Sequence, residues 1–133
     1  MTGVQTCALP ISVCVASEPI PENVSFNEHV APILFAKCAV CHRPGEIAPF
    51  SLLTYADAKK RAKQLAEITT EGTMPPWHAD KDNPLFENNR SLGSEQIALF
   101  AAWHRAGAPE GDPAKLPPTP KFTDGWEIGR AHV

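Results

Sequence analysis

The sequence has little net charge and no long apolar run. Its 133 residues carry a formal net charge of -3, with 20% charged and 43% hydrophobic side chains, as is typical of a globular protein. Because nucleic acids and anionic lipids attract basic surfaces, this charge gives no reason to expect either as a partner. No stretch reaches the roughly 20 apolar residues of a membrane span, so we expect no transmembrane segment. The length suits one domain with one core.

Both ends of the chain resemble translated sequencing adapter. Residues 128–133 can be encoded by a DNA whose opposite strand, read in another frame, encodes residues 6–10. Two unrelated protein ends should not be opposite strands of one short DNA. We therefore expect residues 1–12 and 127–133 to be foreign to the fold, genuine tails being the alternative. Residues 13–23 then read as the remnant of a signal peptide and a linker.

Apolar periodicity and cap residues predict about three helices and no strand. The first helix is expected over residues 26–37, with a capping box formed by Ser25 and Glu28. Pro32 either kinks this helix or marks a later start. The fold class is therefore all-α, with long loops between the helices.

The second and third helices are bounded by cap residues. The second is expected from an N-cap at Thr54 to about Glu71, because Gly72 can end it. The third is expected over residues 95–106, with Ser94 as its cap. Many of the 14 prolines lie in the loops and in residues 112–126, which we expect to form a stiff strap or linker.

One motif carries chemistry, the run Cys38-Ala39-Val40-Cys41-His42. Two thiols separated by two residues can reach the two vinyl groups on one edge of a haem, and the next histidine is then held beneath the iron. The motif predicts one covalently bound haem c. The alternatives are a redox pair, which needs a strand-to-helix setting, and a zinc site, which needs two further ligands such as His78.

Met74 is the predicted second axial ligand of the iron. It lies just after the second helix, and Pro75 and Pro76 stiffen the backbone beside it. A thioether on such a loop can close over the second face of a haem, and His/Met ligation raises the reduction potential. His78 is the main rival, whereas His104 is more typical of a surface or packing histidine.

Three further residues have less specific roles. Arg43 follows the haem histidine directly and could pair with a haem propionate, since a guanidinium fork suits a carboxylate. A solvated charge is the equally acceptable alternative for Arg43. Trp77 and Trp103 are expected to pack as core aromatics or as part of the haem wall.

Several segments together resemble a known family. The chain resembles the cytochrome c-like domain of exported bacterial proteins at residues 24–27, 31–34, 38–45, 48–55, 74–77 and 103–111. In that family the domain often precedes a copper type II, ascorbate-dependent monooxygenase-like region. The resemblance implies an all-α cytochrome c fold over residues 24–111 and a periplasmic or otherwise exported location. It also implies that Cys38 and Cys41 are thioether anchors, that His42 is the proximal ligand and that Met74 is the distal ligand.

These features predict an electron carrier with a single His/Met haem, as one module of a larger exported redox protein. Its expected partner is a redox protein or a downstream enzyme domain, and we expect no enzymatic activity of this segment by itself. Two alternatives stay open. One is a peroxidase-like or ligand-binding haem with an open distal site, and the other is a haem-free redox or zinc module.

Overall fold

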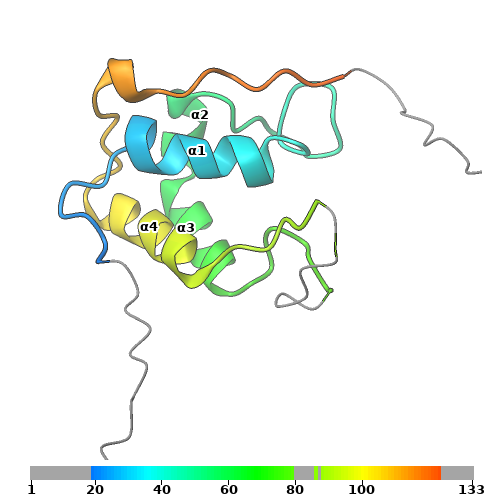
Figure 1. The fold of residues 1–133 in the computed structure, drawn as a ribbon, viewed down its shortest axis with the longest axis horizontal. Coiled ribbons are helices and arrows are strands. Elements are labelled where there is room, and N and C mark those ends of the chain that lie inside the picture. Colours follow the sequence, from blue (N-terminus) through cyan, green and yellow to red (C-terminus); the bar gives the residue numbers. More distant parts are fainter. Residues whose placement is uncertain (1–18, 80–85, 87, 124–133) are drawn as a thin grey trace, which may run out of the picture.

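A computed structural model describes residues 19–79, 86 and 88–123 of the chain. The adapter-like ends and most of the predicted signal-peptide remnant lie outside these residues. Within them the chain forms helices and no strand (Figure 1), so the expected all-α class is confirmed. None of the described helices is long and apolar enough to cross a bilayer.

The first helix is continuous from Phe26 to Cys38 but changes its winding twice. A π-helical turn at Phe26–Val30 precedes α1 (Ala31–Ile33), and a second π-helical turn follows at Leu34–Cys38. Pro32 lies in the central segment, where it lacks an N–H and its ring crowds the carbonyl of the preceding turn. The helix therefore begins at Phe26, so the alternative of a later start near Pro32 is wrong, and its winding widens on either side of the proline.

The predicted capping box at the start of this helix is wrong. The Ser25 side chain makes no cap hydrogen bond, and the Ser25 N–H instead donates to His29 Nδ1 at 3.1 Å. The free N–H groups of Phe26 and Asn27 donate to the carbonyls of Pro109 and Glu110, each at 2.9 Å. A segment distant in sequence thus accepts the hydrogen bonds of the first N–H groups of the helix, which local side chains were expected to accept.

The predicted second helix is two helices, α2 (Tyr55–Lys60) and α3 (Ala62–Thr70), which meet at a break at Arg61. The cap at Thr54 is confirmed, because its hydroxyl accepts a hydrogen bond from the Asp57 N–H at 3.2 Å. Gly72 follows the end of α3 with φ +76°, the left-handed conformation expected of a glycine there. Neither glycine nor proline marks the break at Arg61.

The third predicted helix is α4 (Ser94–Arg105). Its cap is Gly93 and not Ser94, since the Gly93 N–H donates to Gln96 Oε1 at 3.0 Å. Gly107, with φ +84°, follows its end as expected. α4 lies against α3 and against the N-terminal turn of the first helix.

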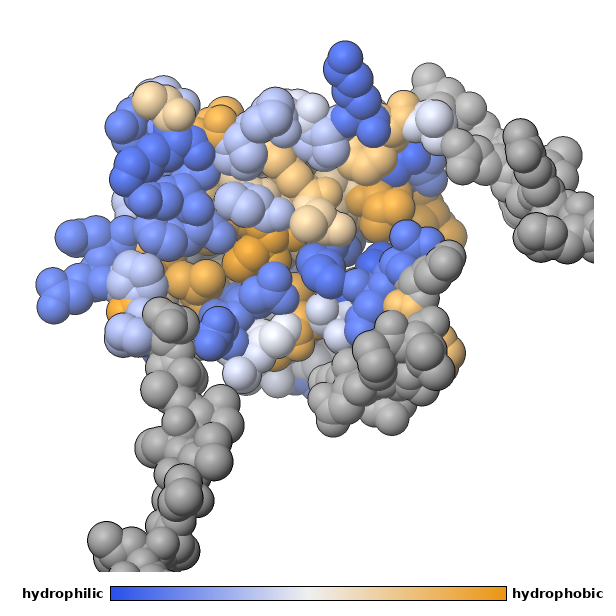
Figure 2. Space-filling view, viewed as in Figure 1, coloured by the Kyte–Doolittle hydropathy of each residue, from blue (hydrophilic) through white to orange (hydrophobic). Residues whose placement is uncertain are grey.

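The core lies where these helices meet, near the start of the first helix and the end of α4. Phe26, Phe100 and Trp103 are its largest fully buried side chains, and the rings of Phe26 and Trp103 are 6.0 Å apart. Trp103 is therefore a core residue, one of the two roles expected for it. On the face shown in Figure 2, apolar side chains are visible between the upper and lower layers of the molecule.

The segment after α4 is a strap that runs along the first helix (Figure 1). It includes a single 3-10 turn at Pro113–Lys115, where Lys115 forms a 2.8 Å ion pair with Glu28. Further along, the Phe122 ring lies 4.1 Å from the Arg43 guanidinium carbon. Contact with the helix begins at Pro109, slightly before the predicted strap boundary at residue 112.

Candidate functional site

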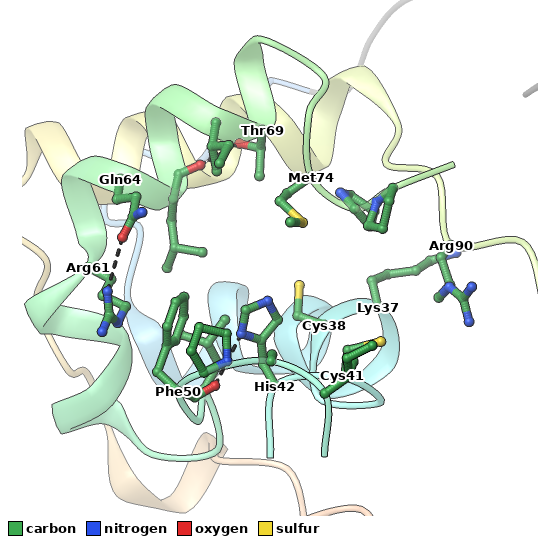
Figure 3. A pocket seen from close by; sticks show the side chains of 18 residues that line it. Lys37, Cys38, Cys41, His42, Phe50, Arg61, Gln64, Thr69, Met74 and Arg90 are labelled. Carbon is green, nitrogen blue, oxygen red and sulfur yellow. Dashed lines mark hydrogen bonds between the residues drawn. The ribbon is translucent and has the colours of Figure 1, made fainter. Parts of the chain in front are cut away.

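A cavity of about 390 Å³ opens at the end of the molecule where the first helix finishes. Its walls come from the end of that helix, the loop after it, α3 and the loop after α3 (Figure 3). The lining residues are Lys37, Cys38, Cys41, His42, Ile47, Ala48, Pro49, Phe50, Leu52, Arg61, Gln64, Leu65, Ile68, Thr69, Met74, Pro75, Pro76 and Arg90. Most of them are apolar, and the volume is in the range of small-molecule and cofactor pockets, roughly 300–1,000 Å³.

Four of the predicted site residues line this one cavity. Cys38, Cys41 and His42 lie on one wall, and Met74 projects from the facing wall (Figure 3). About thirty residues of sequence separate the two walls, so the fold of α2 and α3 brings them together. The predicted set of side chains therefore shares one site.

His42 is held in one orientation by the loop that follows it. Its Nδ1 lies 3.1 Å from the carbonyl oxygen of Phe50, and the two rings are 4.6 Å apart. A carbonyl can only accept, so this contact fixes the proton on Nδ1 and leaves the Nε2 lone pair available to a metal. The loop itself is closed by a 2.9 Å hydrogen bond from the Leu52 N–H to the His42 carbonyl.

Both thiols of the motif are free. Burial, and then the charge of Cys41, raise the pKa of the Cys38 thiol from 9.0 to about 12. Cys38 is therefore a neutral thiol at physiological pH, whereas a catalytic redox cysteine needs a lowered pKa. The strand-to-helix setting of such redox pairs is also absent from the described residues.

Met74 is placed by the turn that ends α3. The N–H groups of Thr73 and Met74 both donate to the Ile68 carbonyl, at 3.2 and 3.4 Å, which folds the chain back toward the cavity. Pro75 and Pro76 continue the same wall. The Met74 side chain remains 38% exposed, which is high for a methionine that serves only as core filling.

The structure places Arg43 and Trp77 outside the described lining of this cavity. Arg43 donates to the Val40 carbonyl and to Glu46, each at 2.6 Å. Trp77 lines a neighbouring cavity of about 20 Å³ that Met74 also lines, and its ring meets Phe86 edge-on at 6.2 Å. The buried Trp77 Nε1 has no hydrogen-bond partner among the described residues.

The two rival histidines are exposed. His78, at the end of the Met74 loop, and His104, in the last turn of α4, are both solvent-accessible. Neither is among the described lining residues of the cavity. The described residues also contain no cluster of three or more His, Cys, Asp or Glu side chains suited to a metal ion.

Sequence reasoning missed Phe50, whose carbonyl orients His42, and the cations Lys37, Arg61 and Arg90 in the cavity wall. Nothing in their local sequence marks them, because their role depends on which wall each helix presents.

No family model matches this chain, and comparisons with curated proteins and with solved structures give no match either. The family resemblance in the sequence therefore stays a prediction.

Proposed function

We propose that this chain is an electron-transfer domain of cytochrome c-like fold that holds one haem c. The observation that carries the proposal is that His42 and Met74 face each other across one apolar cavity whose wall also holds both thiols (Figure 3). In this proposal Cys38 and Cys41 would hold the haem through thioether bonds, and His42 and Met74 would bind its iron.

The residues present fit such a group in three respects. The cavity is lined mainly by apolar side chains, which suits the face of a porphyrin. The thiols are free, and Cys38 is neutral because burial raises its pKa. The Phe50 carbonyl also leaves His42 Nε2 as the ring nitrogen available to iron.

The haem, when bound, would supply a centre that gains and loses one electron. The chain keeps that centre in place: Phe50 orients His42, and the turn after α3 presents Met74. The walls formed by Leu52, Leu65 and Ile68 exclude water, which limits reorganisation when the charge changes. Binding of the iron by both His42 and Met74 would leave no open site on it, which would favour electron transfer over chemistry on a bound ligand.

The location and the partners proposed for this domain follow from the proposed haem attachment. Thioether attachment of haem and the family resemblance both favour an exported bacterial protein. The domain would serve as one module of a larger redox protein, with a separate redox protein or a downstream enzyme domain as its partner. Any monooxygenase activity would belong to that larger protein.

One observation favours a second candidate, a haem with an open distal site. Met74 lies on a loop and is 38% exposed, so it could move aside and leave the proposed iron open to a small ligand. This would give a peroxidase-like or ligand-binding haem protein. The two candidates differ in whether the Met74 thioether is bonded to iron in the resting state.

The test uses protein matured in a bacterial periplasm that contains haem-attachment machinery. We expect haem that survives a denaturing gel, and a weak far-red band of Met–iron bonding in the oxidised protein. Met74→Ala should abolish that band, whereas the control His78→Ala should keep it. Absence of covalent haem would refute the proposal, and a wild type without the band that binds cyanide rapidly would favour the open-site candidate.

A further inference from the structure

The charged side chains in the cavity wall are all cations. Lys37, Arg61 and Arg90 line the cavity, and none of its described lining residues is Asp or Glu. Burying cations against an apolar ligand without a counter-charge is costly. The wall is therefore suited to a ligand that carries negative charge as well as an apolar body.

Arg61 is held in place by two contacts of its guanidinium. It occupies the break between α2 and α3, with φ -117° and ψ 12°. Its guanidinium carbon lies 3.5 Å from the centre of the Phe50 ring, and Nη1 donates to Gln64 Oε1 at 3.1 Å. A guanidinium has five N–H donors, so the Gln64 contact leaves most of them for a ligand. Stacking on Phe50 also restricts the guanidinium to one plane.

The cavity has two chemically different ends. In Figure 3, Cys38, Cys41, Lys37 and Arg90 lie on one side of His42, and Arg61 lies on the other side, beyond Phe50. A protoporphyrin carries its two vinyl groups on one edge and its two carboxylates on the opposite edge. If the vinyl edge meets the thiols, the carboxylate edge points toward Arg61.

We propose that Arg61 binds a carboxylate of the porphyrin at the end of the cavity opposite the thiols. This inference rests on the proposed function and adds to it the residue that orients the ligand. Arg90 and Lys37 lie at the thiol end, and Lys37 Nζ already donates to the Asn89 carbonyl. The propionate partner is therefore Arg61 and not Arg43, which is not among the described lining residues of the cavity and pairs with Glu46 instead.

The experiment compares two probes, hemin and hemin dimethyl ester, titrated into the reduced, haem-free chain of residues 1–133. The probes share the iron and the ring, and only hemin has free carboxylates. Binding is followed by quenching of tryptophan fluorescence and by the Soret band. The ratio of the two affinities is taken within each variant, so any change in the folding of the haem-free chain cancels.

We expect the wild type to prefer hemin by about tenfold or more, the usual size of a hydrogen bond to a charged group. Arg61→Gln should remove most of this preference, and Arg61→Lys should restore part of it. The matched control is Arg90→Gln, which removes an equal charge from the thiol end and should keep the preference. Circular dichroism of each hemin complex checks that the variants fold.

Two results would overturn the inference and leave the proposed function intact. The first is equal affinity of the wild type for both probes while periplasm-matured protein carries covalent haem. The second is an equal loss of preference in Arg61→Gln and Arg90→Gln, which would indicate general attraction and not a defined contact. Failure of the wild type both to bind hemin and to mature with covalent haem would instead refute the proposed function.

Discussion

Replacing Gly111 by alanine tests how closely the strap is packed on the first helix. Gly111 has φ +85°, a region that costs an L-residue about 1–2 kcal/mol. A Cβ at this position would lie 2.5 Å from Ser25 Oγ and 2.6 Å from Ser25 Cβ, well inside van der Waals contact. Relieving this overlap by moving Ser25 or the strap should cost about 1–3 kcal/mol more.

Gly107 provides a matched control a few residues earlier. Its φ is +84°, but a Cβ there would meet nothing within 4 Å. We therefore expect Gly107→Ala to lower the free energy of unfolding by about 1–2 kcal/mol, from the backbone alone. Gly111→Ala should lower it by about 2–5 kcal/mol, because the steric contact is added.

Both variants of the full chain would be unfolded in urea and followed by circular dichroism and tryptophan fluorescence. The midpoint should fall further for Gly111→Ala than for Gly107→Ala, with similar slopes against urea concentration. Equal losses in the two variants would refute the close contact between the strap and Ser25. A larger loss in Gly107→Ala would show that the end of α4 matters more than the strap.

Two further changes test the core and the buried thiol. Trp103→Phe removes the 2.9 Å hydrogen bond from Nε1 to the Pro109 carbonyl and should lower the free energy of unfolding by about 1–3 kcal/mol in urea; an unchanged midpoint would contradict this. Because burial raises the pKa of Cys38 from 9.0 to about 12, the haem-free unfolded chain releases this proton first as the pH rises. The free energy of unfolding of the haem-free protein should therefore fall as the pH rises from 9.0 to about 12. The variant Cys38→Ala should lack that part of the decrease.

Much of the site could be predicted because its chemistry is encoded locally. The motif places Cys38, Cys41 and His42 within five residues, and a helix end followed by two prolines identifies the loop of Met74. The structure brings all four side chains to one cavity. Their ligation of iron stays a prediction, which the Met74 experiment tests.

The features that the sequence did not reveal depend on contacts between distant segments. The Ser25 capping box failed because Pro109 and Glu110 accept the hydrogen bonds of the helix start. The break at Arg61 carries no glycine or proline signal, and its guanidinium stacks on Phe50, eleven residues earlier in the chain. The apolar pattern continues through Arg61, so periodicity alone predicts one helix. The structure instead has two helices, α2 and α3, with the contact between Arg61 and Phe50 at the break between them.

The two ends of the molecule differ in what stabilises them. Phe26, Phe100 and Trp103 fill the end beneath the start of the strap, whereas the other end contains a cavity of about 390 Å³. The strap end is therefore stabilised by its own packing, whereas the end that holds His42 and Met74 would gain packing from the proposed haem. If the proposed haem binds there, its binding and the ordering of these two loops would be coupled, and a substitution that weakens binding should loosen this end before the core.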